Sequence, residues 1–392
     1  MNTPQSLATE VFNPIGWDDF LANNWHKSIA HLSGAEQRFA ALLNWDRLSR
    51  LLEWTPLRPR RMQLLRGGEL LSEERYLRLM DGGARLDAGR LSAELGSGAT
   101  LVVNFIDELI PELAELADEL AKLLNVETSI NVYASWREQS GLDLHADHHD
   151  VLVLQVEGDK HWSVYEPTRH NPLKGDPFVA PHPDAEPVWS GLLRNGGVLY
   201  IPAGFPHLAS AVNGPSLHLT VALSESNGID YLTWLVSQLR DDEDMRSASP
   251  RSSCDGWLTR VREVVANAVS PSSLASFHSA RAGRLDARPR FSFPDIAGRM
   301  PLEWSEFTRI RLTSRRSLGI RYTVGGPTAV EVLAQNWPCS SSVGQRLATL
   351  SSMEVSDIGS LTRGLAPDQL AELKRILGIL FASGALTTEQ SA

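Results

Sequence analysis

The chain has 392 residues, more than one ordinary hydrophobic core accommodates, so two or three domains are expected. Its formal net charge of −10 argues against a general nucleic-acid-binding protein, which needs a positive surface to displace counterions from phosphates. The two cysteines, Cys254 and Cys339, are too few and too far apart for a disulfide framework or a thiolate zinc site. We see no secretory leader and no run of about 18 apolar residues, so we expect a cytoplasmic protein without a membrane partner.

Helical spacing of apolar residues dominates the beginning of the chain. Residues 15–55 carry this spacing in two stretches, and Gly34 lies just ahead of the second. A further amphipathic helix is expected over 103–124, with an interruption at Pro111 because proline lacks the amide hydrogen that a helix interior uses. These segments predict a set of N-terminal helices.

A sheet is expected from residue 128 onward. In the stretch "SINVYASW", Ile130, Val132 and Ala134 alternate with residues of the opposite face, which is the period of a half-buried strand. Short strands separated by glycine and proline turns continue to about residue 224. This pattern is typical of an antiparallel sandwich or barrel.

Helical spacing returns after the sheet region. Residues 256–268 and 271–283 are predicted to form helices, preceded by a polar and flexible loop over 241–256. Another helix is expected over 229–240, where an apolar stripe lies along one face. The stripe is made of Ile229, Leu232, Leu235, Val236 and Leu239.

The C-terminal part is expected to be a small separate unit. The stretch 307–324 looks like a pair of strands, and 341–350 looks like a helix. A second helix is predicted to begin at Pro367, with Asp368 in its first turn, and to end at Gly384. Small strands beside short helices suggest a winged-helix-like module.

The stretch "GLDLHADHHD", residues 141–150, carries the clearest chemical signal of the sequence. If the backbone is a strand, His145 and Asp147 point to the same side, so one imidazole and one carboxylate can meet a single ion. The best third ligand is His207, which a hairpin with the turn Pro202-x-Gly204 would return to the other two. Two histidines and one carboxylate leave open positions, as in non-haem Fe(II) oxygenases, although zinc accepts similar ligands.

Other polar residues of this stretch compete with that assignment. His149 falls on the His145 side if the strand stays regular, and it is the main rival ligand. His148 and Asp150 are expected to face away from the metal. We interpret His148, His149 and Asp150 as a polar strand edge or as groups that contact the metal ligands from outside.

These motifs together resemble a known family. The stretches "NVYAS", "LHADHHDVLVLQVEGDKHWSVYEP", "GGVLYIPAGFPHLASAV" and "SLHLTVAL" within 128–224 resemble the JmjC or cupin-like domain of the ribosomal oxygenases, which are Fe(II)- and 2-oxoglutarate-dependent protein hydroxylases. The resemblance implies an α+β fold with a double-stranded β-helix (jelly-roll) barrel. It also implies three parts: an oxygenase domain with N-terminal helices over 1–228, a helical dimerisation region over 229–295 and a winged-helix-like domain over 296–392.

The resemblance assigns roles to individual residues. It implies that His145, Asp147 and His207 bind the iron, and that Lys160 pairs with the distal carboxylate of 2-oxoglutarate, since a buried dicarboxylate needs a charge-assisted partner. A solvated hairpin lysine is the competing interpretation. Further polar residues are expected near the co-substrate or behind the ligands. They are Asn131, Tyr133, Ser216 and Thr220 for the co-substrate, and His149 and His218 behind the metal.

The function implied is a dioxygenase that hydroxylates an amino-acid side chain, in the first place on a ribosomal protein. Two alternatives remain open: a tailoring hydroxylase of a biosynthetic peptide or small metabolite, and a non-catalytic metal-binding regulator. The five arginines between Arg309 and Arg321 could touch nucleic-acid phosphates, but an exposed, charged strand pair explains them better. The expected partners are therefore a protein substrate, O2 and a second copy of the chain.

Overall fold

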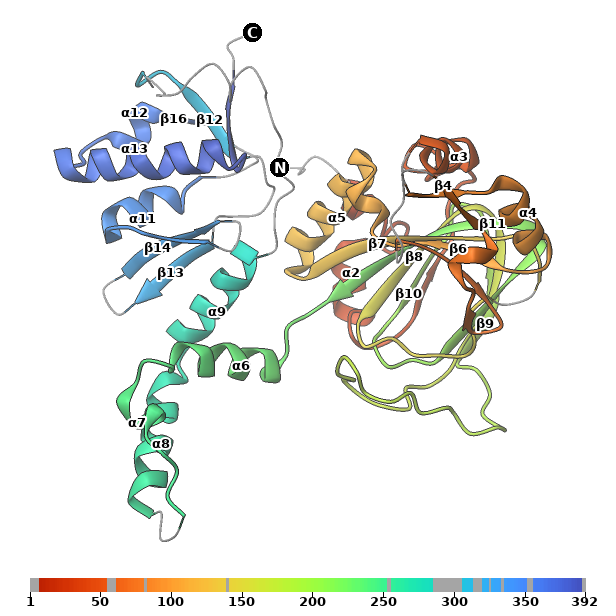
Figure 1. Cartoon of the computed structure of the whole chain (residues 1–392), viewed down its shortest axis with the longest axis horizontal. Helices are drawn as coiled ribbons and strands as arrows, with labels where there is room; N and C mark the ends of the chain where they lie inside the picture. Colours follow the sequence, from red (N-terminus) through yellow and green to blue (C-terminus); the bar gives the residue numbers. More distant parts are fainter. Residues whose placement is uncertain are drawn as a thin grey trace. The chain divides into compact units, whose positions relative to one another are not determined.

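The computed structural model describes residues 7–54, 61–80, 83–138, 141–251, 255–284, 305–312, 319–323, 326–332, 335–350 and 355–389. The chain divides into two compact units, Met1–Glu225 and Ser226–Ala392 (Figure 1). The three-part division with boundaries at 228 and 295 stays a prediction, because 285–304 lies outside the described residues.

The helices of the first unit partly follow the predicted pattern. The single long helix expected after Gly34 is wrong, because residues 36–42 form turns and the helix starts only at Trp45. Gln37 has a φ of 62°, which a right-handed helix cannot accommodate, and its amide donates to Asn195 Oδ1 at 2.9 Å. The helices are α1 (Leu7–Glu10), α2 (Trp17–Asn23), α3 (Trp45–Trp54), α4 (Ala88–Gly96) and α5 (Pro111–Leu124).

Pro111 begins a helix and does not interrupt one. It occupies the first turn of α5, where a missing amide hydrogen costs nothing because that group has no partner within the helix. The preceding residues form the strand β6 (Thr100–Val103) and a short 3-10 turn over Ile106–Glu108. The face of α5 that carries Leu113, Leu116 and Leu120 is fully buried.

A nine-stranded antiparallel sheet dominates the first unit. Its order is β1-β10-β8-β11-β7-β6-β2-β3, with β9 paired to β8, and a separate pair is formed by β4 (Leu77–Met80) and β5 (Gly83–Leu86). The strand predicted from residue 128 is present as β7, and antiparallel strands continue to residue 224 as expected. The other strands are β1 (Ala30–Leu32), β2 (Met62–Arg66), β3 (Glu69–Leu70), β7 (Glu127–Ser135), β8 (Asp150–Val164), β9 (Trp189–Leu193), β10 (Val198–Ile201) and β11 (His207–Ser224).

Alternation along β8 separates two cores. Leu152 and Leu154 pack with buried side chains of the N-terminal helices in the larger cluster. Val151 and Val153 belong to a smaller cluster on the opposite face, together with Trp162. Because side chains of a strand alternate between faces, this second face is the one available to line a cavity.

The second unit begins with four helices and ends with small sheets. The loop expected over 241–256 contains a short helix, α7, whose first turn is capped by the Asp242 side chain. The helices predicted at 229–240, 256–268 and 271–283 are present, and no helix of the described part of the chain is long and apolar enough to cross a membrane. The four helices are α6 (Gly228–Gln238), α7 (Glu243–Arg246), α8 (Asp255–Ala268) and α9 (Pro271–Arg284).

The strand pair predicted over 307–324 is wrong. The strand β12 (Arg309–Leu312) pairs with β16 and β17, whereas β13 (Gly319–Thr323) pairs with β14, so the two belong to different sheets. Sequence alternation identifies a strand but does not name its partner. Arg315 and Arg316 lie outside the described residues. The remaining elements are β14 (Gly326–Val332), β15 (Gln335–Pro338), α11 (Ser341–Leu347), β16 (Ser356–Asp357), α12 (Ile358–Thr362), α13 (Pro367–Ala382) and β17 (Leu386–Glu389).

Candidate metal centre

Backbone pairing brings His145 next to His207. The predicted strand over 145–150 is wrong: within 141–149, which the structure describes completely, His145 alone makes a β-bridge. Its amide donates to the carbonyl of His207 at 3.3 Å, and the amide of His207 donates back at 2.8 Å. The amide of Gly204 donates to the carbonyl of Asp147 at 2.8 Å. We call residues 145–147 and 203–207 the ligand-bearing segments.

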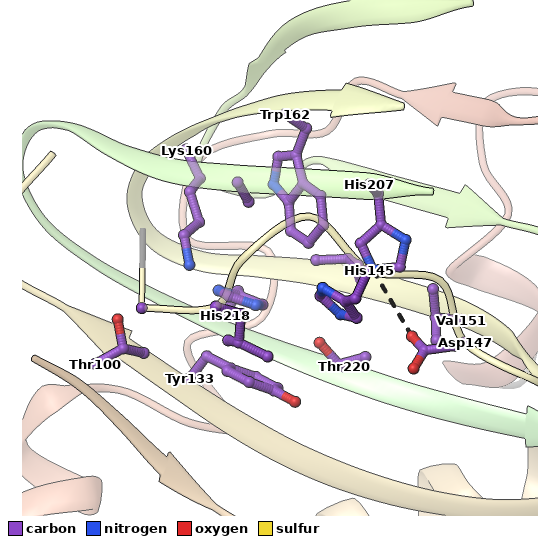
Figure 2. A pocket seen from close by; sticks show the side chains of 14 residues that line it. Thr100, Tyr133, His145, Asp147, Val151, Lys160, Trp162, His207, His218 and Thr220 are labelled. Atoms are coloured by element: carbon purple, nitrogen blue, oxygen red, sulfur yellow. Dashed lines mark ion pairs between the residues drawn. The ribbon is translucent and has the colours of Figure 1, made fainter. Parts of the chain in front are cut away.

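The three predicted ligands converge on one point. One possible ligand atom from each of His145, Asp147 and His207 lies within 4.8 Å of the others. His207 Nε2 is 3.7 Å from Asp147 Oδ2, and the two imidazole centroids are 4.4 Å apart (Figure 2). Separations of this size allow one ion with metal–ligand bonds of about 2 Å to reach all three groups.

The hydrogen bonds of the two imidazoles suit metal binding. His145 Nδ1 lies 2.8 Å from the carbonyl oxygen of Asp143, and His207 Nδ1 lies 3.0 Å from that of Phe205. When Nδ1 carries the hydrogen, Nε2 presents a lone pair to an ion. Burial, and then the neighbouring His145, lower the pKa of His207, so this imidazole is neutral at neutral pH. The donor set therefore fits a divalent metal.

A pocket of about 510 Å³ opens beside the three ligands. Lys160 lines it and is only 5% exposed. Burial lowers the pKa of Lys160 to about 7, and Nζ lies 3.5 Å from the hydroxyl of Ser135. Among the described residues that line this pocket, Asp147 is the only acid, so none of them is a dedicated carboxylate partner for the buried amine. Such a group suits an anionic ligand.

Two of the residues predicted near the co-substrate do line the pocket. Tyr133 stacks on His218 with centroids 5.0 Å apart and an interplanar angle of 4°, and Thr220 lies two residues further along β11. Burial raises the pKa of Tyr133 to about 12, so its hydroxyl stays protonated. Burial also lowers the pKa of His218, which keeps this imidazole neutral.

Three other predicted residues do not line the pocket. Asn131 accepts a hydrogen bond from the amide of Phe105 at 3.0 Å and interacts with the hydroxyl of Tyr133. The hydroxyl of Ser216 accepts one from the side-chain amide of Gln155 at 2.9 Å. The His149 ring contacts that of His148 at a tilt of 58°, and its Nδ1 is buried without a partner among the described residues.

Sequence reasoning missed Trp162. Its indole contributes to the pocket wall, and its Nε1 is buried without a hydrogen-bond partner among the described residues. Two-residue spacing from Lys160 along β8 is the signal that would have indicated it. Figure 2 shows Lys160, Trp162 and His207 directed into one space. We call Tyr133, Lys160, Trp162, His218 and Thr220 the pocket floor.

Comparison with known proteins agrees with this geometry. Residues 105–231 match the model of the JmjC domain. Ribosomal oxygenase 2 of Rattus norvegicus is 33% identical over 149 residues, which are 36% of this chain and 32% of that protein. The bifunctional lysine-specific demethylase and histidyl-hydroxylase NO66 of Drosophila persimilis is 31% identical over 112 residues, 28% of this chain and 16% of that protein. The chain thus spans a third or less of the length of these curated relatives.

Among solved structures, that of the Escherichia coli ribosomal oxygenase YcfD is similar with a TM-score of 0.57. The match covers 95% of this chain and 98% of that chain at 17% identity, so it shows the fold. The predicted JmjC, cupin-like fold is confirmed, with its large antiparallel sheet and flanking helices. Residues 105–231 form a JmjC domain, homologous to part of the ribosomal oxygenases.

Proposed function

We propose that the protein is an Fe(II)- and 2-oxoglutarate-dependent dioxygenase that hydroxylates an amino-acid side chain of a ribosomal protein. The observation that carries this proposal is the convergence of His145, Asp147 and His207 at the edge of a pocket that also contains the buried amine of Lys160. The triad accounts for the metal, and the amine accounts for an acidic co-substrate.

The three ligands would hold iron by two imidazole nitrogens and one carboxylate oxygen. This donor set would leave coordination positions open for a 2-oxo acid and O2. The metal would supply the oxidative chemistry, in which O2 and 2-oxoglutarate give succinate and CO2 and one oxygen atom enters a C–H bond of the substrate. The carbonyls of Asp143 and Phe205 keep both imidazoles in the tautomer that can bind the ion.

The pocket floor would bind the co-substrate. When protonated, Lys160 donates to the distal carboxylate of 2-oxoglutarate, and the hydroxyl groups of Tyr133 and Thr220 are available beside it. A related observation comes from a similar protein: the Escherichia coli oxygenase YcfD was solved in complex with cobalt and 2-oxoglutarate. The apolar side chains of Val151 and Val153 line the same pocket and help to exclude water.

The substrate proposal depends on the relatives and on charge. The curated relatives are named as ribosomal oxygenases and histidyl-hydroxylases. Ribosomal proteins are basic in order to bind RNA, and the net charge of −10 on this chain favours their encounter.

A second copy of the chain is the proposed partner of α6. Leu235 is buried, but Ile229 and Val236 on the same predicted stripe are each 58% exposed within the described chain. Pairing of two such faces would remove this apolar surface from water. The solution mass measured by light scattering would be that of a dimer, and a monomer at micromolar concentration would refute this part.

The test of the function is succinate release from purified protein with Fe(II), 2-oxoglutarate and O2, with ribosomal proteins added. We expect turnover that rises with one ribosomal protein, which gains 16 Da, and that disappears in Asp147→Ala. Asp184→Ala is the matched control, because this side chain is 91% exposed. Turnover that survives in Asp147→Ala would contradict the proposal.

A further inference from the structure

Asp150 is a buried carboxylate at the start of β8, three residues after Asp147. It is 2% exposed and sits among several donors. Its Oδ1 accepts a hydrogen bond from the amide of Ala203 at 2.8 Å. Its Oδ2 accepts one from the hydroxyl of Tyr200 and lies 2.9 Å from His26 Nδ1. Leaving a buried carboxylate without hydrogen-bond partners costs free energy, so these donors together fix the position of the Asp150 side chain.

Asp150 lies at the point where the pairing between β8 and β10 ends, next to the ligand-bearing segments. Regular pairing between β8 and β10 ends with Val151 opposite Ile201, although Asp150 still pairs with Leu223 of β11. The residues just before Asp150 and just after Ile201 lie outside regular strands. From there on, single hydrogen bonds hold the two ligand-bearing segments together. The bond from Ala203 to the Asp150 carboxylate is the first of them, followed by the Gly204–Asp147 bond and the pair between the ligand histidines.

His26 and Tyr200 hold the carboxylate from the other side. The backbone amide of His26, a residue with a φ of 57°, donates to the hydroxyl of Tyr200 at 2.9 Å. The second ring nitrogen of His26, Nε2, lies 3.1 Å from Glu225 Oε1, so a carboxylate faces each of the two nitrogens of this imidazole. The Tyr200 ring is fully buried and packs edge-on against Phe20 of α2 at 4.9 Å. Contacts thus connect Phe20 of α2 through Tyr200 to Asp150, which lies next to the ligand-bearing segments.

We propose that Asp150, held by His26 and Tyr200, is a positioning residue of the metal centre: it fixes the spacing of the two ligand-bearing segments so that Asp147 and His207 reach the same ion. This inference rests on the proposed function only in assuming that the triad binds a divalent metal. Asp150 does not touch the ion; it acts through the segments that carry the ligands.

The substitution Asp150→Asn tests this idea because the amide keeps the size of the carboxylate and changes its hydrogen bonding. An amide has one accepting oxygen, and its NH2 group can only donate. One oxygen of Asp150 faces the Ala203 amide, which can only donate, and the other faces the Tyr200 hydroxyl and His26 Nδ1. In one orientation the new NH2 group opposes the Ala203 amide, and in the other Tyr200 and His26 must accept where they now donate. In either orientation a hydrogen bond that holds Asp150 is lost or reversed.

Asp107→Asn is the matched control. Asp107 is also a buried carboxylate, 3% exposed, and its Oδ1 accepts a hydrogen bond from the amide of Ile130 at 2.9 Å. It lies outside the residues that line the pocket. Both substitutions therefore perturb a buried carboxylate that binds backbone, but only one of them is next to the ligand-bearing segments.

The measurement is the binding of cobalt(II) alone to the full chain, by its visible absorption and by titration against a chelator, with the melting temperature recorded in parallel. We expect Asp150→Asn to weaken cobalt binding by about 10- to 100-fold and to change the spectrum. Asp107→Asn should change the affinity less than about twofold and leave the spectrum unaltered. Equal cobalt affinity in Asp150→Asn and wild type would overturn the inference, as would equal losses in both variants.

If Asp150→Asn does not fold, Tyr200→Phe decides the question, because it removes one donor to Asp150 and keeps the buried ring. A several-fold loss of cobalt affinity would support the inference, and an unchanged affinity would overturn it. Failure of the wild-type chain to bind cobalt(II) would overturn the proposed function together with this inference. Cobalt binding without succinate release would contradict the proposed function alone.

Discussion

The pocket floor and the ligand-bearing segments line the same cavity, but different interactions hold them. The floor residues sit on β7, β8 and β11. Pairing between β7 and β11 is continuous and places Tyr133 opposite His218, whereas pairing between β8 and β11 shifts its register between Val212 and His218. His145 and Asp147 sit in an irregular segment with one β-bridge, and His207 is the first residue of its strand. Strand pairing thus places the pocket floor and His207, whereas individual hydrogen bonds place His145 and Asp147.

This difference has a functional consequence. A regular ladder loses little when one side chain changes, because the backbone bonds remain. An irregular segment depends on particular groups, such as the Gly204 amide and the Asp150 carboxylate. Variants of the floor should therefore change co-substrate binding alone, and variants of the ligand-bearing segments should remove the metal.

The largest expected effect is that of His145→Ala. Loss of one of three ligands should reduce cobalt(II) affinity by more than about 100-fold and leave no measurable iron-dependent succinate release. His161→Ala is the control, because this histidine lies on β8 with an exposed side chain. Undiminished metal binding in His145→Ala would show that His145 is not a ligand and would direct attention to His149.

The second effect in size is that of Lys160→Met, which keeps the apolar stem and removes the charge. Loss of a charge-assisted hydrogen bond of about 1.5–3 kcal/mol should raise the 2-oxoglutarate concentration for half-maximal turnover by about 10- to 100-fold. Cobalt(II) affinity should not change, because Lys160 is on the regular ladder. Lys174→Met, at an exposed position, is the control. A loss of cobalt(II) binding in Lys160→Met would show that the pocket floor and the ligand-bearing segments do not act separately.

The same contrast explains which parts of the site the sequence could predict. The alternation of Tyr133 and Thr220 with their neighbours agrees with two of the five residues of the pocket floor, because side chains of a paired strand follow a period of two. Asn131 satisfied the same period, but its side-chain oxygen, Oδ1, accepts a hydrogen bond from the Phe105 amide. Periodicity gives the face of a residue but not the neighbours that occupy its polar atoms.

The metal end could be predicted only as a motif. Residue type and spacing identified His145, Asp147 and His207 as candidate ligands, and the structure brings these three side chains together. His145 is placed by one β-bridge to His207 and not by the strand that was expected. Asp150 was expected to face away from the metal, either in a polar strand edge or among groups that contact the ligands from outside. Its partners are His26 and Tyr200, 124 and 50 residues away in the chain. No local pattern encodes contacts of that separation.

A smaller effect on 2-oxoglutarate affinity is expected from the titration of Lys160 in the pocket floor. The pKa of Lys160 in the ligand-free protein is about 7, and only the protonated amine pairs with a carboxylate. 2-Oxoglutarate affinity should therefore be highest below pH 7 and fall by up to about tenfold per unit above it, as the amine loses its proton. Titrations of the cobalt-loaded protein between pH 6 and 8.5 would measure this. Lys160→Met should flatten the profile, and an equal slope in this variant would assign the titration to another group.

The smallest effect concerns the stability that His26 gives to the metal end. Burial lowers the pKa of His26, but the hydrogen bonds to Asp150 and Glu225 outweigh burial and raise it to about 9, from 6.5 in the unfolded chain. A raised folded-state pKa contributes stability that is complete below pH 6.5 and is lost as pH rises through 9. The melting temperature of wild type should exceed that of His26→Gln by a few degrees at pH 6, and the gap should close near pH 10. A gap that is constant across this range would mean that the imidazolium charge does not stabilise the contact between the N-terminal helices and Asp150.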